Sequence, residues 1–271
     1  MDRYVVIGNP VSHSLSPAIH AHFAAQAADA IEYGTLLVPS GEFMPQAQAF
    51  FDGGGKGANV TLPFKVDAFH WARVRSERAE IAEAANFLAV RSGIVEADNT
   101  DGAGLVSDLT RNLGVQLRGR RILVIGAGGA ARGVIAPLLA QNPQRLVIAN
   151  RTVGRARALA QRFASLGGVE AAALDTIPAD DFDVVVNATS TSTHGEPLLV
   201  PDRVLECAGI AYDMAYGAAA KPFLERARSR GTRASDGLGM LVEQAAESFL
   251  LWRGRRPATA AILSELRSHL A

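Results

Sequence analysis

Short apolar runs alternate with longer, mixed segments along the whole chain. In the first hundred residues the apolar or β-branched runs are 3–8, 32–38, 57–61 and 87–90, and helical patterns begin at Ser16-Pro17 and cover 42–51. Ser16-Pro17 is a good helix start because a proline in the first turn forfeits no hydrogen bond that the helix needs. Strands that alternate with helices predict an α/β fold with largely parallel sheets.

A second series of alternating elements begins at Arg121. The run 122–126 is continuously apolar, as expected of a strand that is buried on both faces. The pattern predicts further strands at 146–150, 183–187, 210–214 and 232–235, with helices at 130–140, 155–166 and 222–230. From Gly239 onward it predicts two helices separated by residues 253–257.

Length and composition fit two globular domains and exclude several classes of protein. The 271 residues are 48% hydrophobic, and 27 basic residues balance 27 acidic ones, which argues against a nucleic-acid partner. No apolar run is long enough to span a bilayer, and the first residues lead straight into a strand, so we expect neither a membrane span nor a signal peptide. Cys207 is the single cysteine, which excludes an internal disulfide and a cysteine-based zinc site. We expect a reduced, cytoplasmic protein without a metal.

A glycine-rich turn follows the strand at 122–126. Gly126 allows the tight turn, Gly128 lets the backbone approach a pyrophosphate, and Ala131 lets the next helix pack close to the strand. The amino end of that helix offers free N–H groups and the positive end of the helix dipole. We therefore predict a dinucleotide site. Its residues are Gly126, Ala127, Gly128, Gly129 and Ala130.

The end of the next strand distinguishes between the two nicotinamide cofactors. NAD sites place Asp or Glu there to bind the ribose 2′-hydroxyl, whereas this chain has Asn150-Arg151-Thr152 followed by Arg155. A guanidinium can hold a 2′-phosphate with paired, charge-assisted hydrogen bonds, and a carboxylate would repel it. We predict NADP, bound by these four residues. The alternative is that both arginines belong to a solvated helix start.

Polar residues gather at three further strand ends, in the stretches 8–17, 59–65 and 98–102. Ligand sites in open α/β sheets lie at the carboxyl ends of strands, so these stretches are candidates for a substrate site. Two of their residues, Lys65 and Asp101, carry opposite charges. Taken singly, the lysine could be a solvated helix-start residue and the aspartate a helix cap.

Several motifs together resemble the shikimate dehydrogenase family, in the family's order and over nearly the whole chain. They occupy residues 14–17, 59–65, 99–102, 126–131, 150–152, 187–190, 212–216 and 236–245. The resemblance implies NADPH-dependent, reversible reduction of 3-dehydroshikimate to shikimate in aromatic amino-acid biosynthesis. It also implies two domains with the active site in the cleft between them. A Rossmann-type NADP-binding domain would cover 104–237, and a smaller open α/β substrate domain would combine 1–103 with 238–271.

The resemblance also implies roles for individual residues. Lys65 would give a proton to the alkoxide that forms when a hydride reaches the ketone, and Asp101 would orient the ammonium group. Acid–base help of this kind contributes about 10²–10⁴ in rate, and the cofactor carries the harder step. The implied substrate contacts are Ser14, Ser16 and Tyr216 for the carboxylate, and Thr61, Asn86, Asp101 and Gln244 for the ring hydroxyls. The further implied cofactor contacts are Glu77, Thr189, Ser190, Met214 and Gly237.

One stretch departs from the family pattern. Where the family reads Gly-Ala-Val-Asn-Thr, this chain has Glu83, Ala84, Ala85, Asn86 and Phe87. The departure leaves open the shape of the wall beside Asn86, and with it a preference for a related ring acid such as quinate. A further alternative is a non-catalytic NADP or shikimate sensor, although a sensor does not need a lysine–aspartate proton shuttle. Monomer and homodimer both stay open.

Overall fold

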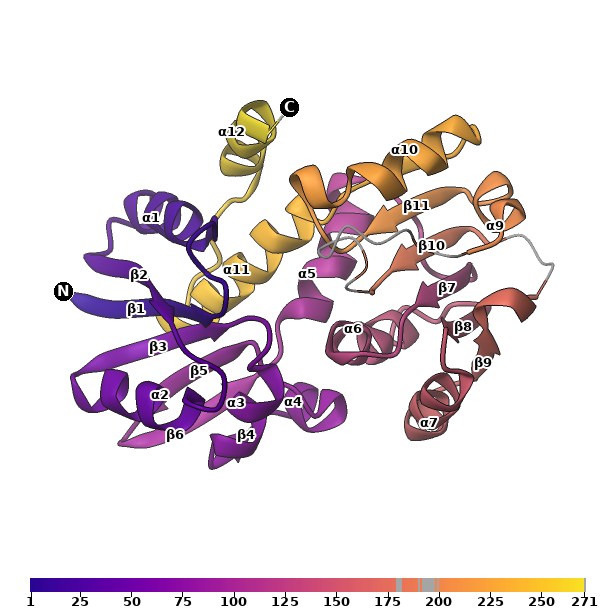
Figure 1. The fold of residues 1–271 in the computed structure, drawn as a ribbon. Helices are drawn as coiled ribbons and strands as arrows, with labels where there is room; N and C mark the ends of the chain where they lie inside the picture. Colours follow the sequence, from indigo (N-terminus) through magenta and orange to yellow (C-terminus); the bar gives the residue numbers. More distant parts are fainter. Residues whose placement is uncertain (179–181, 190, 192–197, 199, 271) are drawn as a thin grey trace. The chain divides into compact units, whose positions relative to one another are not determined.

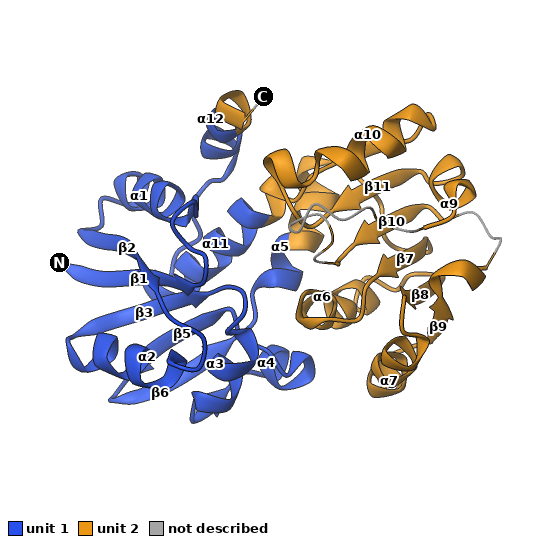
Figure 2. Ribbon diagram, in the orientation of Figure 1, with its two compact units in different colours: residues 1–104, 241–266 blue, residues 105–240, 267–271 orange. Residues whose placement is uncertain are grey.

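The chain folds into two compact units, described here from a computed structural model (Figure 1). The structure describes residues 1–178, 182–189, 191, 198 and 200–270. Unit 1 consists of residues 1–104 and 241–266, and unit 2 of residues 105–240 and 267–271 (Figure 2). The limits between the units fall inside helices α5 (Asp101–Ser107), α11 (Leu238–Arg253) and α12 (Ala260–Leu270).

Unit 1 contains a mixed six-stranded sheet in the order β2-β1-β3-β5-β6-β4. Its strands are β1 (Asp2–Gly8), β2 (Ile31–Leu37), β3 (Gly55–Val60), β4 (Val74–Arg75), β5 (Phe87–Arg91) and β6 (Ile94–Asp98). Its remaining helices are α1 (Ser16–Ala27), α2 (Phe43–Asp52), α3 (Lys65–Trp71) and α4 (Glu77–Ala82). β1 is parallel to β2 and β3, and β4 is parallel to β6.

The sheets are largely parallel, as expected, and the exception lies in unit 1, where β5 runs antiparallel to both β3 and β6. A two-residue turn reverses the chain between β5 and β6. Its residues, Ser92 and Gly93, have φ angles of 51° and 76°. Positive φ at both central positions defines a type I′ turn, whose twist matches that of the strands in a hairpin.

Unit 2 contains a six-stranded sheet in the order β12-β11-β10-β7-β8-β9, with all its described pairings parallel. Its strands are β7 (Arg121–Ile125), β8 (Arg145–Asn150), β9 (Val169–Ala173), β10 (Val184–Asn187), β11 (Ile210–Asp213) and β12 (Arg233–Ser235). Its helices are α6 (Gly129–Leu139), α7 (Val153–Phe163), α9 (Asp202–Glu206) and α10 (Lys221–Ser229), with short turns η1 (Asp108–Asn112), η2 (Leu174–Thr176) and η3 (Gly217–Ala219). This strand order is that of a Rossmann-type domain, whose winding reverses between β7 and β10.

Each unit has its own hydrophobic core. In unit 1 it includes Ile7, Val60 and Leu88 from neighbouring strands. In unit 2 the central strands contribute Leu123 and Val147, both fully buried. Strands covered on both faces read as continuous apolar runs, which is why the sequence pattern located them. Within the described residues, no helix has the length and apolar character that crossing a membrane requires.

Candidate functional site

Lys65 and Asp101 form an ion pair in unit 1, with Lys65 Nζ and Asp101 Oδ2 2.6 Å apart. Lys65 is the first residue of α3, after the turn that ends β3, and Asp101 is the first residue of α5, after β6. Two separate strand ends therefore bring a cation and a carboxylate into contact. The side chains are 18% and 6% exposed, respectively, so the ammonium is more accessible to a ligand than the carboxylate is.

An amide holds Asp101 from its other oxygen. Asn86 Nδ2 donates to Asp101 Oδ1 at 2.8 Å, and it lies 3.2 Å from Gln244 Oε1. Asn86 Oδ1 accepts the backbone N–H of Thr100 at 2.7 Å, which fixes the orientation of the amide because a backbone N–H can only donate. Asn86, Gln244 and Thr100 are all buried. Four of the residues singled out from sequence, Lys65, Asp101, Asn86 and Gln244, thus form one connected group.

The two serines and Thr61 follow neighbouring parallel strands, β1 and β3, so they emerge at the same edge of the sheet. Ser16 N donates to Ser14 Oγ at 3.3 Å at the start of α1. Ser16 is buried and Ser14 is partly exposed. Gly8 ends β1, and a side chain there would collide with the methyl group of Thr61. The absence of a side chain at Gly8 therefore lets the two strand ends approach each other.

Tyr216 and Glu77 are not joined to this group by any described contact. Tyr216 lies in unit 2, directly before η3, and burial raises its pKa. Glu77 is exposed at the first position of α4. The roles expected for Tyr216 on the carboxylate and for Glu77 on the cofactor stay predictions.

The stretch that departs from the family pattern has a clear place in the structure. Phe87 is buried and packs on Trp252 of α11, with ring centroids 5.1 Å apart. Glu83 follows α4 at the C-cap and has a φ of 46°, in the left-handed region that glycine adopts most easily. The change at position 83 therefore places a side chain where the backbone favours glycine.

The glycine turn of unit 2 lies beside the reversal point of its sheet. Gly126 has a φ of 114°, and a Cβ there would lie 2.9 Å from the carbonyl oxygen of Ala188, so the turn requires glycine. Gly128 and Gly129, in contrast, face open space, with nothing within 4 Å of the position of a Cβ. The helix α6 begins at Gly129, and its N-cap provides no side-chain hydrogen bond. Open backbone and an uncapped helix start fit a pyrophosphate.

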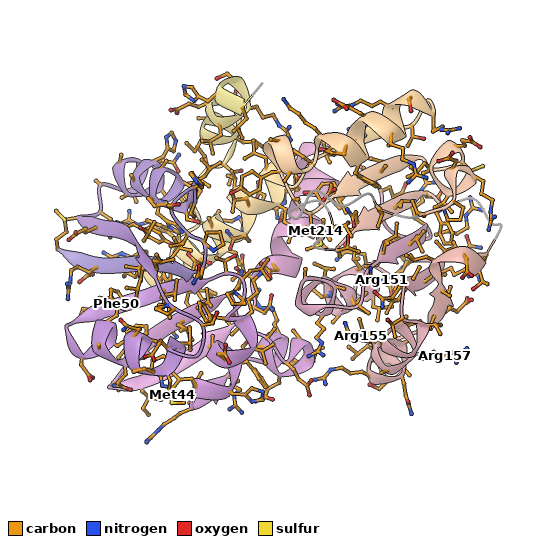
Figure 3. The ribbon with its side chains drawn as sticks, viewed as in Figure 1. Met44, Phe50, Arg151, Arg155, Arg157 and Met214 are labelled. Atoms are coloured by element: carbon orange, nitrogen blue, oxygen red, sulfur yellow. The ribbon has the colours of Figure 1, made fainter. Side chains whose placement is uncertain are left out.

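Two arginines follow β8, the strand next to β7. Arg151 and Arg155 are exposed, and neither guanidinium has a hydrogen bond or ion pair with a residue that the structure describes (Figure 3). Asn150 orders the turn before them, since its Nδ2 donates to the Thr152 carbonyl at 3.0 Å. Residues 150–155 contain no carboxylate. Available guanidinium groups at this strand end suit the 2′-phosphate of NADP.

The remaining cofactor candidates lie after β10 and β11. Thr189 Oγ1 donates to Asn187 Oδ1 at 2.7 Å, directly after β10. Gly237 N donates to the Ala215 carbonyl at 2.9 Å, and a side chain on Gly237 would collide with the backbone of Met214, which is labelled in Figure 3. Ser190 lies outside the described residues. The contacts of these residues with a cofactor stay predictions.

Sequence reasoning gave no role to a set of polar side chains behind the Lys65–Asp101 pair. Thr100 and Asn59 stand inside the motifs at 99–102 and 59–65, but the sequence pattern assigns neither a role. Ser248 lies four residues after Gln244 in α11, and this spacing places both on one face of the helix. That spacing was the signal available in the sequence.

Models of protein families match most of the chain. The shikimate dehydrogenase substrate-binding domain matches residues 6–88, shikimate/quinate 5-dehydrogenase matches 108–207, and the shikimate 5′-dehydrogenase C-terminal domain matches 237–267. The shikimate dehydrogenase (NADP(+)) of Acidovorax sp. (strain JS42) is 52% identical over 274 residues, which cover 100% of this chain and 97% of the relative. That of Dechloromonas aromatica (strain RCB) is 51% identical over 270 residues, covering 99% and 98%.

Solved structures agree with these matches. An Ael1 enzyme from Pseudomonas putida has a TM-score of 0.92 and 46% identity, covering 98% of both chains. The shikimate 5-dehydrogenase from Thermus thermophilus, in complex with NADP(H) and shikimate, has a TM-score of 0.85 and 30% identity, covering 100% of both chains. Family models and full-length relatives confirm the family that the motifs resemble, and the chain belongs to the shikimate dehydrogenase family.

Proposed function

We propose that this protein catalyses the NADPH-dependent, reversible reduction of 3-dehydroshikimate to shikimate, a step of aromatic amino-acid biosynthesis. The observation that carries the proposal is the 2.6 Å contact between Lys65 Nζ and Asp101 Oδ2, within a group of hydrogen-bonding side chains. Full-length relatives are named shikimate dehydrogenase (NADP(+)), and the Thermus thermophilus structure contains both NADP(H) and shikimate.

The residues of this group suit the proton transfer that the reaction requires. NADP, when bound, exchanges a hydride with the substrate. Lys65 gives a proton to the ketone oxygen during reduction and takes it back during oxidation, as a general acid and base. Asp101 orients the ammonium through Oδ2, while Asn86 holds Oδ1 at 2.8 Å. Both carboxylate oxygens are thereby fixed.

The substrate is a carboxylate on a hydroxylated ring, and we assign it to unit 1. Ser14 and Ser16, both in unit 1, bind the carboxylate, and hydroxyl donors suffice because such hydrogen bonds are charge-assisted. Hydrogen bonds with Thr61, Asn86, Asp101 and Gln244 select the ring hydroxyls, with the Asp101 carboxylate as an acceptor. A site of this kind strongly rejects analogues that lack those groups, since its own polar atoms are then left unpaired.

We assign NADP to unit 2. The glycine turn at Gly126–Gly129 and the following α6 bind the pyrophosphate, and Arg151 and Arg155 bind the 2′-phosphate. These assignments rest on the open backbone at Gly128 and Gly129 and on the exposure of both guanidinium groups. A cytoplasmic location, and a state of monomer or homodimer, stay predictions.

A dehydrogenase assay with matched substrates tests the proposal. Purified protein is mixed with NADP and either shikimate or quinate, and the formation of NADPH is followed by absorbance; NAD replaces NADP in a parallel series. We expect shikimate with NADP to give the highest kcat/KM. A higher kcat/KM for quinate than for shikimate would instead identify the protein as a dehydrogenase that prefers quinate. Tight NADPH binding with no turnover of either acid would instead favour a sensor.

A further inference from the structure

Beneath the Lys65–Asp101 group, unit 1 contains polar side chains that the proposed proton transfer does not use. We call Tyr33, Asn59 and Ser248 the polar layer. Asn59 is 5% exposed and Ser248 is fully buried. Burying such groups is unfavourable unless each finds a hydrogen-bond partner. The partners of the polar layer therefore indicate what it does.

The hydrogen bonds of the polar layer have defined directions. Asn59 Nδ2 donates to the Asn86 backbone carbonyl at 3.2 Å and to Ser248 Oγ at 2.9 Å. A carbonyl oxygen only accepts, so the Asn59 amide cannot be reversed. Its oxygen, Oδ1, accepts the Tyr33 hydroxyl at 2.7 Å, and Ser248 Oγ donates to the Gln244 carbonyl at 3.0 Å. The protons of all three side chains are therefore assigned.

The polar layer reaches the reacting pair through Asn86. Asn59 contacts the Asn86 backbone, and Ser248 Oγ lies 3.3 Å from Thr100 Oγ1. Thr100 Oγ1 in turn accepts from Asn86 Nδ2 at 2.9 Å. The same Nδ2 donates to Asp101 Oδ1 at 2.8 Å. A shift in the layer would therefore move Asn86 and, through it, the carboxylate that orients Lys65.

The other end of the polar layer is held by α1. The Tyr33 ring stacks on His20, with centroids 4.2 Å apart and planes within 7°. His20 lies four residues after Ser16 in α1, on the same face of the helix. Burial raises the pKa of Tyr33 far above its usual range, although a hydrogen bond with the Ser16 side chain opposes the rise. The hydroxyl thus stays protonated and keeps donating to Asn59.

We propose that Tyr33, Asn59 and Ser248 are positioning residues, which hold Asn86 and Asp101 in the reactive orientation without touching the substrate. The proposal rests on the proposed dehydrogenase function. A layer that only filled space could be replaced by apolar groups of the same shape at little cost. An orienting layer needs its donors and acceptors, because misplacing a catalytic group by about 1 Å can lower the rate by as much as about 10²-fold.

Two conservative variants test this role. Tyr33→Phe removes one hydroxyl and keeps the ring that stacks on His20, and Ser248→Ala removes the hydroxyl next to Thr100. The matched control is Tyr4→Phe. Tyr4 is a buried tyrosine of the same unit that packs on Trp252 at 4.7 Å and contacts Arg253, outside the polar layer. The wild type and each variant are compared in kcat, in KM for shikimate and for NADP, and in the midpoint of urea unfolding.

We expect Tyr33→Phe and Ser248→Ala each to lower kcat about three- to tenfold and to raise KM for shikimate by a similar factor. KM for NADP should stay at the wild-type value, since the glycine turn and the two arginines assigned to NADP lie in unit 2. In the double variant the losses should be smaller than the product of the single losses, because both changes disrupt one chain of contacts. Tyr4→Phe should shift the urea midpoint and leave KM for shikimate unchanged.

Two outcomes would overturn the proposal. The first is a lower urea midpoint in both variants with wild-type KM for shikimate and wild-type kcat per folded molecule, which is the behaviour of a structural layer. The second is fully multiplicative losses in the double variant, which would mean that the two residues act separately. Both outcomes require a wild-type protein that oxidises shikimate. A wild type without that activity would contradict the proposed function instead.

Discussion

At the scale of single residues, the strongest claim concerns Lys65. We expect Lys65→Ala to lower kcat about 10²–10⁴-fold, because the alkoxide loses its proton donor, while the dissociation constant of shikimate stays near the wild-type value. Steady-state rates and an equilibrium titration measure the two quantities. Lys56→Ala, which changes an exposed lysine of β3, is the control. Near-normal turnover in Lys65→Ala would exclude the proposed role.

Arg151 tests the choice of cofactor. Charge-assisted hydrogen bonds contribute roughly 1.5–3 kcal/mol each, so Arg151→Ala should weaken NADPH binding about 10- to 100-fold and barely change NADH binding. Arg157→Ala is a matched control, because Arg157 lies two residues beyond Arg155 in α7 and extends to the other side of the helix (Figure 3). Fluorescence titrations with both nucleotides give the affinities. Equal losses for NADPH and NADH would remove the assignment.

The residues of the candidate site divide into those that the sequence could identify and those that it could not. Lys65 and Asp101 stand in stretches that end strands, and the rule for strand ends together with the family motifs was enough to find them. Ser248 and Tyr33 are 215 positions apart in the printed sequence, and each has an unremarkable local context. Their roles depend on how α11, which carries Ser248, packs against the sheet that contains Tyr33. A single sequence does not specify this packing.

At the scale of secondary-structure elements, two helices end on a residue that is poorly suited to its backbone. Ala28 at the end of α1 and Glu83 at the end of α4 have φ angles of 52° and 46°. A left-handed residue other than glycine is strained by roughly 1–2 kcal/mol. Glycine avoids this strain, but it loses more backbone entropy on folding, which costs about 0.5–1 kcal/mol. We expect Ala28→Gly and Glu83→Gly each to stabilise unit 1 by up to about 1 kcal/mol.

Urea unfolding of the two glycine variants measures this stabilisation. Ala28 is exposed, so Ala28→Gly isolates the backbone effect, whereas Glu83→Gly also removes the interactions of a carboxylate side chain. The midpoint for Ala28→Gly should rise. A rise for Ala28→Gly together with a fall for Glu83→Gly would mean that the Glu83 side chain stabilises more than its backbone conformation destabilises. A fall in both would contradict the strain argument.

The elements that the sequence predicted are those with a strong hydrophobic pattern. The buried strands of unit 2 were found within a residue or two of their ends, because an apolar run bounded by polar residues is a clear signal. The strands β4, β6 and β9 were missed. β4 has only two residues, β6 ends in a buried aspartate, and β9 is largely alanine, so each has a weak strand pattern. Ser92-Gly93 could have indicated the β5–β6 hairpin.

At the scale of the whole molecule, one buried imidazole couples folding to pH. His20 is fully buried among aromatic rings, and burial lowers its pKa from 6.5 to about 3. Between these values the unfolded chain binds a proton that the folded chain does not. Acid therefore favours unfolding, so the stabilisation is complete above pH 6.5 and is lost as the pH falls toward 3. The loss can reach about 1.4 kcal/mol per pH unit.

Carboxylates change the folding stability in a separate, more acidic pH range. The contribution of His20 can therefore be measured alone. Burial alone would raise the pKa of Asp98, but hydrogen bonds from Arg78 and Ser76 bring it below 3.8 overall. Its stabilisation is present above pH 3.8 and is lost only below it. The other described carboxylates with lowered pKa values also take up protons in the unfolded chain only near or below pH 4.5. Between pH 6.5 and 4.5, the described residue with a shifted pKa that becomes protonated on unfolding is therefore His20.

We therefore expect the free energy of unfolding to fall between pH 7 and pH 5 in the wild type, and to fall much less in His20→Phe. Phenylalanine cannot titrate, and it keeps a ring against Tyr33 and Trp252. Its larger size changes the stability at any one pH, so the slope with pH is the quantity to compare. Urea unfolding at half-unit pH intervals gives both slopes. Parallel curves of unfolding free energy against pH would show that His20 also takes up its proton in the folded state over this pH range. The aromatic cluster around His20 would then have to admit a counter-charge or water.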